Sequence, residues 1–218
     1  MPRALFEKRG KAVWISHLDL MRLFQRAFKR AGLPLTHTQG FNPRPSVSIA
    51  LPLSVGVESR CELLDFTLDK VAVPCGEICQ RLNAALVDGV RVLDVYEEGR
   101  KLKELSLLRC RVSLEYDGGV PEGAADQIRE LFDRDSLTVE KKGKNGIVEQ
   151  DIIPMIKSFE LSCTADTITI EAVICCQNPT LNPVQLSAAV ERYLPEYGAD
   201  VVTCSRVELY DHNETIFR

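Results

Sequence analysis

The sequence predicts an α+β protein of two tandem ferredoxin-like units, each with the order βαββαβ, the second carrying an inserted β-hairpin. Short alternating apolar stretches flank amphipathic segments in the same order in both halves of the chain. Residues 97–104 are charged and have no apolar period, so they separate the two halves. We therefore expect domains at residues 1–98 and 105–218. The 45% apolar content of the 218 residues is enough for real cores.

The first unit begins with an alternating stretch at residues 3–8, which residues 12–15 continue after a turn, as a strand or short hairpin. The clearest helix pattern follows. Ser16 is the expected N-cap, with Asp19 three residues on, and Gly32 and Pro34 end the helix. The apolar stripe expected to face the core comprises Ile15, Leu18, Met21, Phe24, Phe28 and Ala31.

An irregular connection with three prolines and one glycine follows at residues 33–45. Long connections without regular structure are uncommon in compact domains and are often functional or disordered, so this segment is a candidate site. The unit is then completed by expected strands at 46–51 and 61–68, a helix at 73–86 and a strand at 90–96.

The second unit repeats this order. Strands are expected at residues 105–116, 157–164, 167–176 and 201–210. The first helix is expected at residues 122–134, and the second is capped by Asn182, with Pro183 at its first position and Gln185 three residues on. This second helix is expected to direct Val184, Ala188 and Leu194 inward. The inserted hairpin occupies residues 136–151, with a turn at Lys144-Asn145-Gly146.

Charge is distributed unevenly along the chain. Residues 1–60 hold ten lysines and arginines against three acidic residues, a net of +7, whereas the remainder carries −11, for a total of −4. A basic first quarter on an acidic body suits the steering of a polyanion. The alternative is a solvated basic face on an ordinary domain.

The cysteine spacing and the hydropathy indicate which classes of protein this sequence does not fit. The eight cysteines include no Cys-x2-Cys pair and no Cys-x3-Cys-x2-Cys cluster. We therefore predict no metal site and no cofactor, and expect most of these cysteines to be small buried apolar side chains. No apolar run reaches 18 residues and the N-terminus lacks a signal-peptide centre, so we expect a cytoplasmic protein without membrane contact.

The first helix and the connection after it combine the groups that bind single-stranded RNA. Cations neutralise phosphates, an aromatic ring stacks on an unpaired base, and amides reach base edges. Prolines on both sides stiffen the connection and lower the cost of ordering it. The candidate RNA-binding residues are Arg22, Arg26, Lys29, Arg30, His37, Gln39, Phe41, Asn42 and Arg44. In the alternative interpretation, Phe41 fills the core and the prolines only shape the chain.

A catalytic hypothesis rests on two histidines. His17 lies in the first turn of the first helix, where the helix dipole favours neutral imidazole, and His37 lies in the connection. Two such groups beside a phosphate would permit metal-independent cleavage of RNA through its own 2′-hydroxyl. Both residues are also compatible with plain capping or hydrogen-bonding roles.

Three stretches of the first unit carry a family resemblance. They are ISHLDLMR at residues 15–22, continued by Arg26-Ala27 and RAGLP, then QGFNP at 39–43, and PLSVGVES at 52–59. Together they resemble the radical SAM-linked protein family, also called domain of unknown function 2344. Arg44 stands where the family pattern leads us to expect histidine, which weakens a catalytic interpretation of the connection.

The resemblance implies an accessory protein of a separate radical SAM enzyme, fused to it or encoded beside it, with a link to RNA through neighbouring genes. The leading hypothesis is therefore a non-catalytic RNA-binding partner of that enzyme in RNA modification or processing. Two alternatives stay open. One is a protein–protein adaptor without RNA contact, and the other is an endoribonuclease using His17 and His37.

Overall fold

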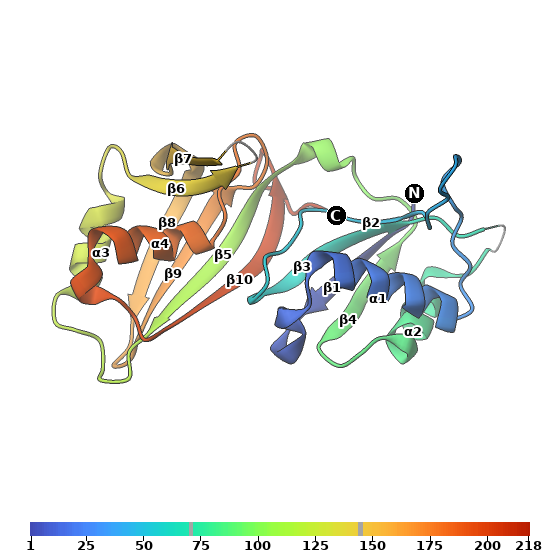
Figure 1. Cartoon of the computed structure of the whole chain (residues 1–218), viewed down its shortest axis with the longest axis horizontal. Helices are drawn as coiled ribbons and strands as arrows, with labels where there is room; N and C mark the ends of the chain where they lie inside the picture. Colours follow the sequence, from blue (N-terminus) through green and yellow to red (C-terminus); the bar gives the residue numbers. More distant parts are fainter. Residues whose placement is uncertain (70–71, 144–145) are drawn as a thin grey trace. The chain divides into compact units, whose positions relative to one another are not determined.

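The computed structural model describes residues 1–69, 72–143 and 146–218. It is a mixed α+β fold whose described residues form four α-helices and mostly antiparallel sheet (Figure 1). The chain divides into two compact units, residues 1–104 with 217–218, and residues 105–216. Among the described residues, every helix is too short or too polar to cross a membrane.

Unit 1 places two helices on one face of a four-stranded sheet. Its elements are β1 (Arg3–Lys8), the 3₁₀ helix η1 (Gly10–Trp14), α1 (His17–Arg30), β2 (Val47–Ile49), β3 (Val57–Phe66), α2 (Cys75–Ala85), β4 (Val90–Tyr96) and η2 (Leu102–Glu104). The strand order is β4-β1-β3-β2, and every neighbouring pair is antiparallel. Helices α1 and α2 lie side by side on this sheet (Figure 1).

The core of unit 1 lies between these helices and the sheet. Phe24 of α1 meets Phe6 of β1 edge to face, with ring centroids 4.7 Å apart, and Phe28 packs against Phe66 of β3 at 5.0 Å. All four rings are fully buried. Because buried aromatic side chains contribute large apolar areas, these pairs fix how α1 sits on the sheet.

Unit 2 has the same arrangement with a hairpin added. Its elements are β5 (Leu105–Glu115), α3 (Ala124–Phe132), β6 (Thr138–Gly143), β7 (Gly146–Asp151), η3 (Ile153–Met155), β8 (Ile156–Cys163), β9 (Thr167–Cys175), α4 (Val184–Tyr193), η4 (Pro195–Tyr197) and β10 (Val201–Asp211). The strand order is β10-β5-β9-β8, again antiparallel throughout. Strands β6 and β7 pair with each other, and the Tyr193 hydroxyl donates to the Thr138 carbonyl at 3.0 Å.

One predicted cap is confirmed and the other is shifted by one residue. The Ser16 hydroxyl accepts a hydrogen bond from the Asp19 amide at 3.2 Å at the start of α1. Helix α4 begins at Val184 with Pro183, not Asn182, at the N-cap position. The Asn182 side chain, one residue earlier, still accepts from the Val184 amide, and the Gln185 side chain accepts from the Asn182 amide at 3.0 Å.

Several local expectations for unit 1 are wrong. Residues 12–15 do not continue β1, because the chain turns at Gly10, which has φ +55°, into η1. Strand β3 begins at Val57, earlier than expected, because Ser59 pairs with Lys8 of β1. Leu18 is 67% exposed, since it lies six residues from Phe24 and so about 120° away around the helix.

In unit 2 the inward face of α4 differs from the prediction. Val184 is 42% exposed and Ala188 is exposed, whereas Leu186, Ala189 and Val190 face the core. Only Leu194 of the three expected side chains is buried. The predicted turn at residues 144–146 falls partly on residues 144–145, which lie outside the described residues.

All eight cysteines are free, and five of them are buried. Desolvation by burial raises the pKa of the Cys110 thiol from its usual value near 9 to about 12, and it raises the pKa of Cys176 to about 12 and of Cys204 to about 11. Such thiols resist ionisation and behave as small apolar side chains.

Candidate nucleic-acid interface

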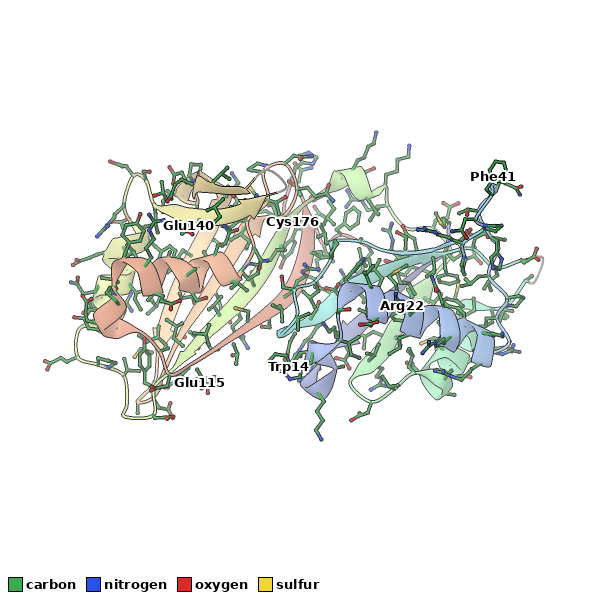
Figure 2. All side chains as sticks on the ribbon, in the orientation of Figure 1. Trp14, Arg22, Phe41, Glu115, Glu140 and Cys176 are labelled. Atoms are coloured by element: carbon green, nitrogen blue, oxygen red, sulfur yellow. The ribbon has the colours of Figure 1, made fainter. Side chains whose placement is uncertain are left out.

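Helix α1 presents a row of cations on its solvent side. Arg22, Arg26 and Lys29 are spaced by four and three residues, so they lie on one face of the helix. The opposite face is committed to the core through Leu20, Phe24, Ala27 and Phe28. Burial of that apolar face therefore holds the three cations outward together. Figure 2 shows Arg22 on this helix.

The cations of α1 differ in what they already bind. Arg22 donates to Asp19 at 2.9 Å on the exposed surface. The pKa of the Asp19 carboxyl is lowered, first by the Ser16 hydroxyl and then by Arg22. Arg30 donates to the Ala85 carbonyl at the end of α2, where a cation also complements the helix dipole.

Two cations of α1 are available to a ligand. Within the part of the chain that the structure describes, the side chains of Arg26 and Lys29 have no hydrogen-bond or ion-pair partner. Both are exposed on the helix surface. They therefore retain their full charge for a phosphate, whereas Arg22 and Arg30 would first have to leave existing partners.

The connection after α1 is an ordered two-armed loop. Its base is joined to the sheet side of the unit, where the Thr36 amide donates to the Thr67 carbonyl at 2.9 Å. Further up, the Thr38 amide donates to the Arg44 carbonyl at 2.8 Å, and the Arg44 amide donates to the Thr38 hydroxyl at 3.0 Å. His37 and Pro45 form a β-bridge between the arms. These bonds give the loop a defined shape.

The tip of the loop, residues 39–43, extends into solvent. Phe41 is fully exposed, with 112% of its reference accessible area, and it does not fill the core. Figure 2 shows its ring at the end of the loop. Gln39 and Asn42 beside it are also exposed, as is Arg44, whose side chain has no partner among the described residues. Gly40 has φ +137°, a conformation that favours glycine and sets the bend.

A pocket of about 450 Å³ lies where the C-terminal half of α1 meets this loop. Lys29 contributes from the helix and His37 from the loop. The remaining lining comes from Gln25, Phe28, Gly32, Leu33, Pro34, Leu35 and Pro45. The basic helix and the proline-containing loop therefore meet at one concave site, with Arg26 on the same helix face as Lys29.

The two histidines of the catalytic hypothesis are not brought together. His37 lines the pocket beside Lys29, whereas His17 is the first residue of α1. Twelve helical residues at about 1.5 Å each separate His17 from Lys29, or roughly 18 Å along the axis. The Nδ1 atom of His17 is buried without a hydrogen-bond partner among the described residues. His17 therefore begins α1, whereas His37 lines a pocket at the other end of this helix.

Several residues of the site were not predicted from the sequence. Phe28 is predicted as a core residue and Leu33 lies at the start of the predicted irregular connection; both are buried, and both are among the residues that line the pocket. No sequence motif marks Gln25 as a site residue. The available signal was the helix-ending sequence at residues 30–35, because a glycine followed by apolar residues reverses the chain against the helix it has just left.

Metal-binding groups are absent from the described site. Across residues 1–69, 72–143 and 146–218, no three His, Cys, Asp or Glu side chains gather closely enough to hold a metal ion. The interface therefore offers a pocket with apolar lining and the polar groups of Gln25, Lys29 and His37, together with further exposed cations, amides and the Phe41 ring on α1 and the loop.

Comparison with solved structures supports the mixed α+β fold. The chain is similar to one in a crystal structure of a Cbf5-Nop10-Gar1 complex, with a TM-score of 0.53 and 9% identity over 95% of this chain and 48% of that chain. This chain thus spans about half the length of that one. It is also similar to an unknown protein from Galdieria sulphuraria, with a TM-score of 0.26 and 12% identity over 94% of this chain and 96% of that one.

Comparison by sequence identifies the family. No curated protein matches the chain. Residues 2–183 match the family described as an uncharacterized protein conserved in bacteria. The match spans the basic helix, the loop and most of unit 2. The chain therefore belongs to this bacterial family, DUF2344.

Proposed function

We propose that this protein is a non-catalytic RNA-binding accessory protein that works with a separate radical SAM enzyme in the cytoplasm. The observation that carries the proposal is one pocket lined by Lys29 of α1 and His37 of the loop. Arg26 is exposed on the same face of α1 as Lys29, and Phe41 and Arg44 are exposed on the same loop as His37. Among the described residues, no acidic side chain lines this pocket.

The arrangement suits single-stranded RNA better than a duplex. An exposed aromatic ring gains binding energy by stacking on a base that is not already stacked in a helix, and a base–aromatic stack is worth about 1–3 kcal/mol. The amides of Gln39 and Asn42, on either side of Phe41, reach base edges in the same unpaired segment. The bonds between the loop arms reduce the entropy lost on binding.

The architecture in this proposal is two ferredoxin-like units. Both units have the element order βαββαβ and the same strand order, in which the first strand lies between the third and the fourth. In unit 2 the β6–β7 hairpin is an insertion between the first helix and the second strand. Fold likeness does not set function, so the proposal rests on the interface in unit 1.

The partner enzyme is inferred from the sequence motifs. The ISHLDLMR, QGFNP and PLSVGVES stretches are those by which the chain resembles radical SAM-linked proteins. The first two contribute residues to α1 and to the exposed loop tip. In this scheme the present protein holds the RNA, and the separate enzyme carries out the reaction.

The test is the salt dependence of RNA binding. Wild type and an Arg26→Ala/Lys29→Ala/Arg44→Ala variant are titrated against a labelled single-stranded 12-residue RNA by fluorescence anisotropy from 20 to 200 mM salt. Each phosphate contact contributes about 0.7 to the slope of log affinity against log salt for single strands, so the variant's slope should fall by about 2. A Lys103→Ala/Arg109→Ala/Lys157→Ala variant removes the same charge elsewhere and should bind like wild type.

Arg30 is left intact in this design because it supports α2 through the Ala85 carbonyl. Equal, weak binding by wild type and by the interface variant at low salt would contradict the proposal. A duplex of the same sequence should bind more weakly than the single strand. Preference for the duplex would contradict the stacking role of Phe41.

The adaptor function is a second candidate because two large apolar side chains are exposed. Trp14, the last residue of η1, is 72% exposed, and Leu18, in the first turn of α1, is 67% exposed. Large apolar side chains left in water are typical of protein contacts. If the adaptor role is correct, the partner enzyme should co-purify after RNase treatment and be lost from a Trp14→Ser/Leu18→Ser variant, while the wild-type protein shows no RNA affinity.

A further inference from the structure

The pocket beside α1 is formed by the way the helix ends. The Gly32 amide donates to the Lys29 carbonyl at 3.3 Å, and the Leu33 amide donates to the Phe28 carbonyl at 2.9 Å. This is the Schellman pattern, in which a residue with positive φ closes the helix, and Gly32 has φ +66°. The chain therefore reverses, and residues 33–35 form one side of the pocket while α1 forms the other.

The pocket combines apolar walls with a few polar groups. Phe28 and Leu33 are among the lining residues but are fully buried, so the apolar surface open to a ligand comes from Pro34, Leu35 and Pro45. The volume of about 450 Å³ falls in the range of about 300–1,000 Å³ typical of small-molecule sites. Gln25, Lys29 and His37 supply the polar atoms. Such a site accepts a flat group with apolar faces and a polar edge.

We propose that this pocket receives one unstacked base of a single-stranded RNA, while the phosphates on either side of that base lie against Arg26, Lys29 and Arg44. The inference rests on the RNA-binding function proposed above and adds a base-specific subsite to it. The Gln25 amide offers both donors and an acceptor to a base edge, and the Lys29 ammonium offers donors only. Phe41, at the loop tip, takes a neighbouring base of the same strand.

Charge argues for a nucleotide rather than an apolar side chain of a protein. The side chains of these three cations make no hydrogen bond or ion pair among the described residues, and the first 60 residues carry a net charge of +7. The ligand that best matches these cations is a chain in which every flat apolar group is flanked by negative charges. A nucleic acid strand has this pattern at every residue, whereas a peptide would need acidic residues flanking an aromatic one.

The experiment uses short RNAs with one base removed. A labelled pentamer and five versions of it, each with one abasic residue, carry the same phosphates and differ only in a base. The Gln25→Trp variant fills the pocket from the helix surface without altering charge. Gln80→Trp makes the same change on the exposed surface of α2, outside the pocket lining, and serves as the control. Circular dichroism and thermal unfolding verify that both variants fold.

For wild type and Gln80→Trp, we expect one abasic position to weaken binding about tenfold, because the pocket then receives no base. This position is different from the one whose base stacks on Phe41. A Phe41→Ala variant identifies that second position. Gln25→Trp should bind the intact pentamer about tenfold more weakly and should no longer distinguish the abasic version. A Gln25→Leu variant, which keeps the pocket open, should retain the abasic effect but change the preference among the four bases.

The outcomes separate the two proposals. If wild type binds RNA with the expected salt dependence but Gln25→Trp behaves like Gln80→Trp, the base subsite is wrong and the RNA-binding function stands. If wild type binds no pentamer at 20 mM salt, both are wrong. If an acidic peptide with alternating Glu and Phe displaces RNA and its binding is abolished by Gln25→Trp while abasic RNAs bind normally, the pocket takes a protein side chain instead.

Discussion

Individual residues determine where α1 begins and ends: Ser16 caps its start, and Gly32 ends it. Gly32 allows the reversal that creates the pocket, and its ideal Cβ would meet no atom within 4 Å. A side chain at this position is therefore limited by backbone conformation and not by space. Ser16 acts at the other end of the helix through one hydrogen bond to the Asp19 amide.

The Gly32→Ala variant should lower the free energy of unfolding by about 1–2 kcal/mol, because a non-glycine residue is strained in the left-handed region. Gly76→Ala is the matched control. Gly76 lies in α2 with no positive φ and with nothing within 4 Å, so alanine should stabilise the helix by up to about 1 kcal/mol. Urea denaturation of both variants measures the difference. Equal effects of the two substitutions would show that φ at Gly32 is not the cause.

Among the helices and strands, α2 is held to the edge strand β4 by one amide side chain. The Asn83 Nδ2 donates to the Val92 carbonyl at 2.9 Å, and the Asn83 Oδ1 accepts from the Val92 amide at 2.8 Å. The end of α2 is also held by Arg30 through the Ala85 carbonyl. The position of α1, and with it the pocket, thus depends on contacts with its neighbouring helix.

The Asn83→Ala variant should destabilise unit 1 by about 1–3 kcal/mol, because both polar groups of Val92 lose their amide partner in a partly buried place. Hydrogen exchange should show faster exchange of the Val92 amide in particular. Asn83→Asp is the comparison. It keeps an acceptor for the Val92 amide but places a carboxylate against the Val92 carbonyl, so it should be at least as destabilising. A neutral Asn83→Ala variant would mean that the hydrogen-bond pair contributes nothing to stability.

At the scale of the whole molecule, the two units carry different kinds of functional group. Cationic binding groups lie in unit 1, while the thiols with the most strongly raised pKa values, Cys110, Cys176 and Cys204, lie in unit 2. Because burial favours the neutral thiol, the folded state of unit 2 retains protons that the unfolded chain releases in alkali.

Stability of unit 2 should therefore decrease as the pH rises above about 9, towards the folded-state pKa values of about 11 to about 12. The contribution of each thiol is fully present below the unfolded pKa, and its loss is at most about 1.4 kcal/mol per pH unit. Urea denaturation at pH 8, 9 and 10 measures the slope. Cys110→Val, which removes one titrating group at nearly constant volume, should reduce it. An unchanged slope in Cys110→Val would contradict the assignment to this thiol.

Local patterns in the sequence predict most elements and the cap at Ser16, because they depend on neighbours along the chain. The strand at Val90–Tyr96 has the expected bounds, and the Ser16 hydroxyl accepts from the Asp19 amide as expected. At α4 the N-cap is Pro183, one residue after the predicted Asn182. The exposed side of α1 also follows from periodicity, since Arg22, Arg26 and Lys29 are spaced for one face. Leu18 departs from the predicted stripe, because its angle around the helix places it away from Phe24 and leaves it exposed.

The contacts between distant segments followed from packing alone. Three features depend on how α1, α2 and the loop pack on the sheet: Arg30 binds the Ala85 carbonyl, Phe41 is exposed, and Gln25 and His37 line one pocket. Periodicity fixes which face a side chain occupies, but not which partner from another segment meets it there. Those partners are chosen by the burial of Phe24 and Phe28 against β1 and β3, and this burial sets where every other group on the helix is placed.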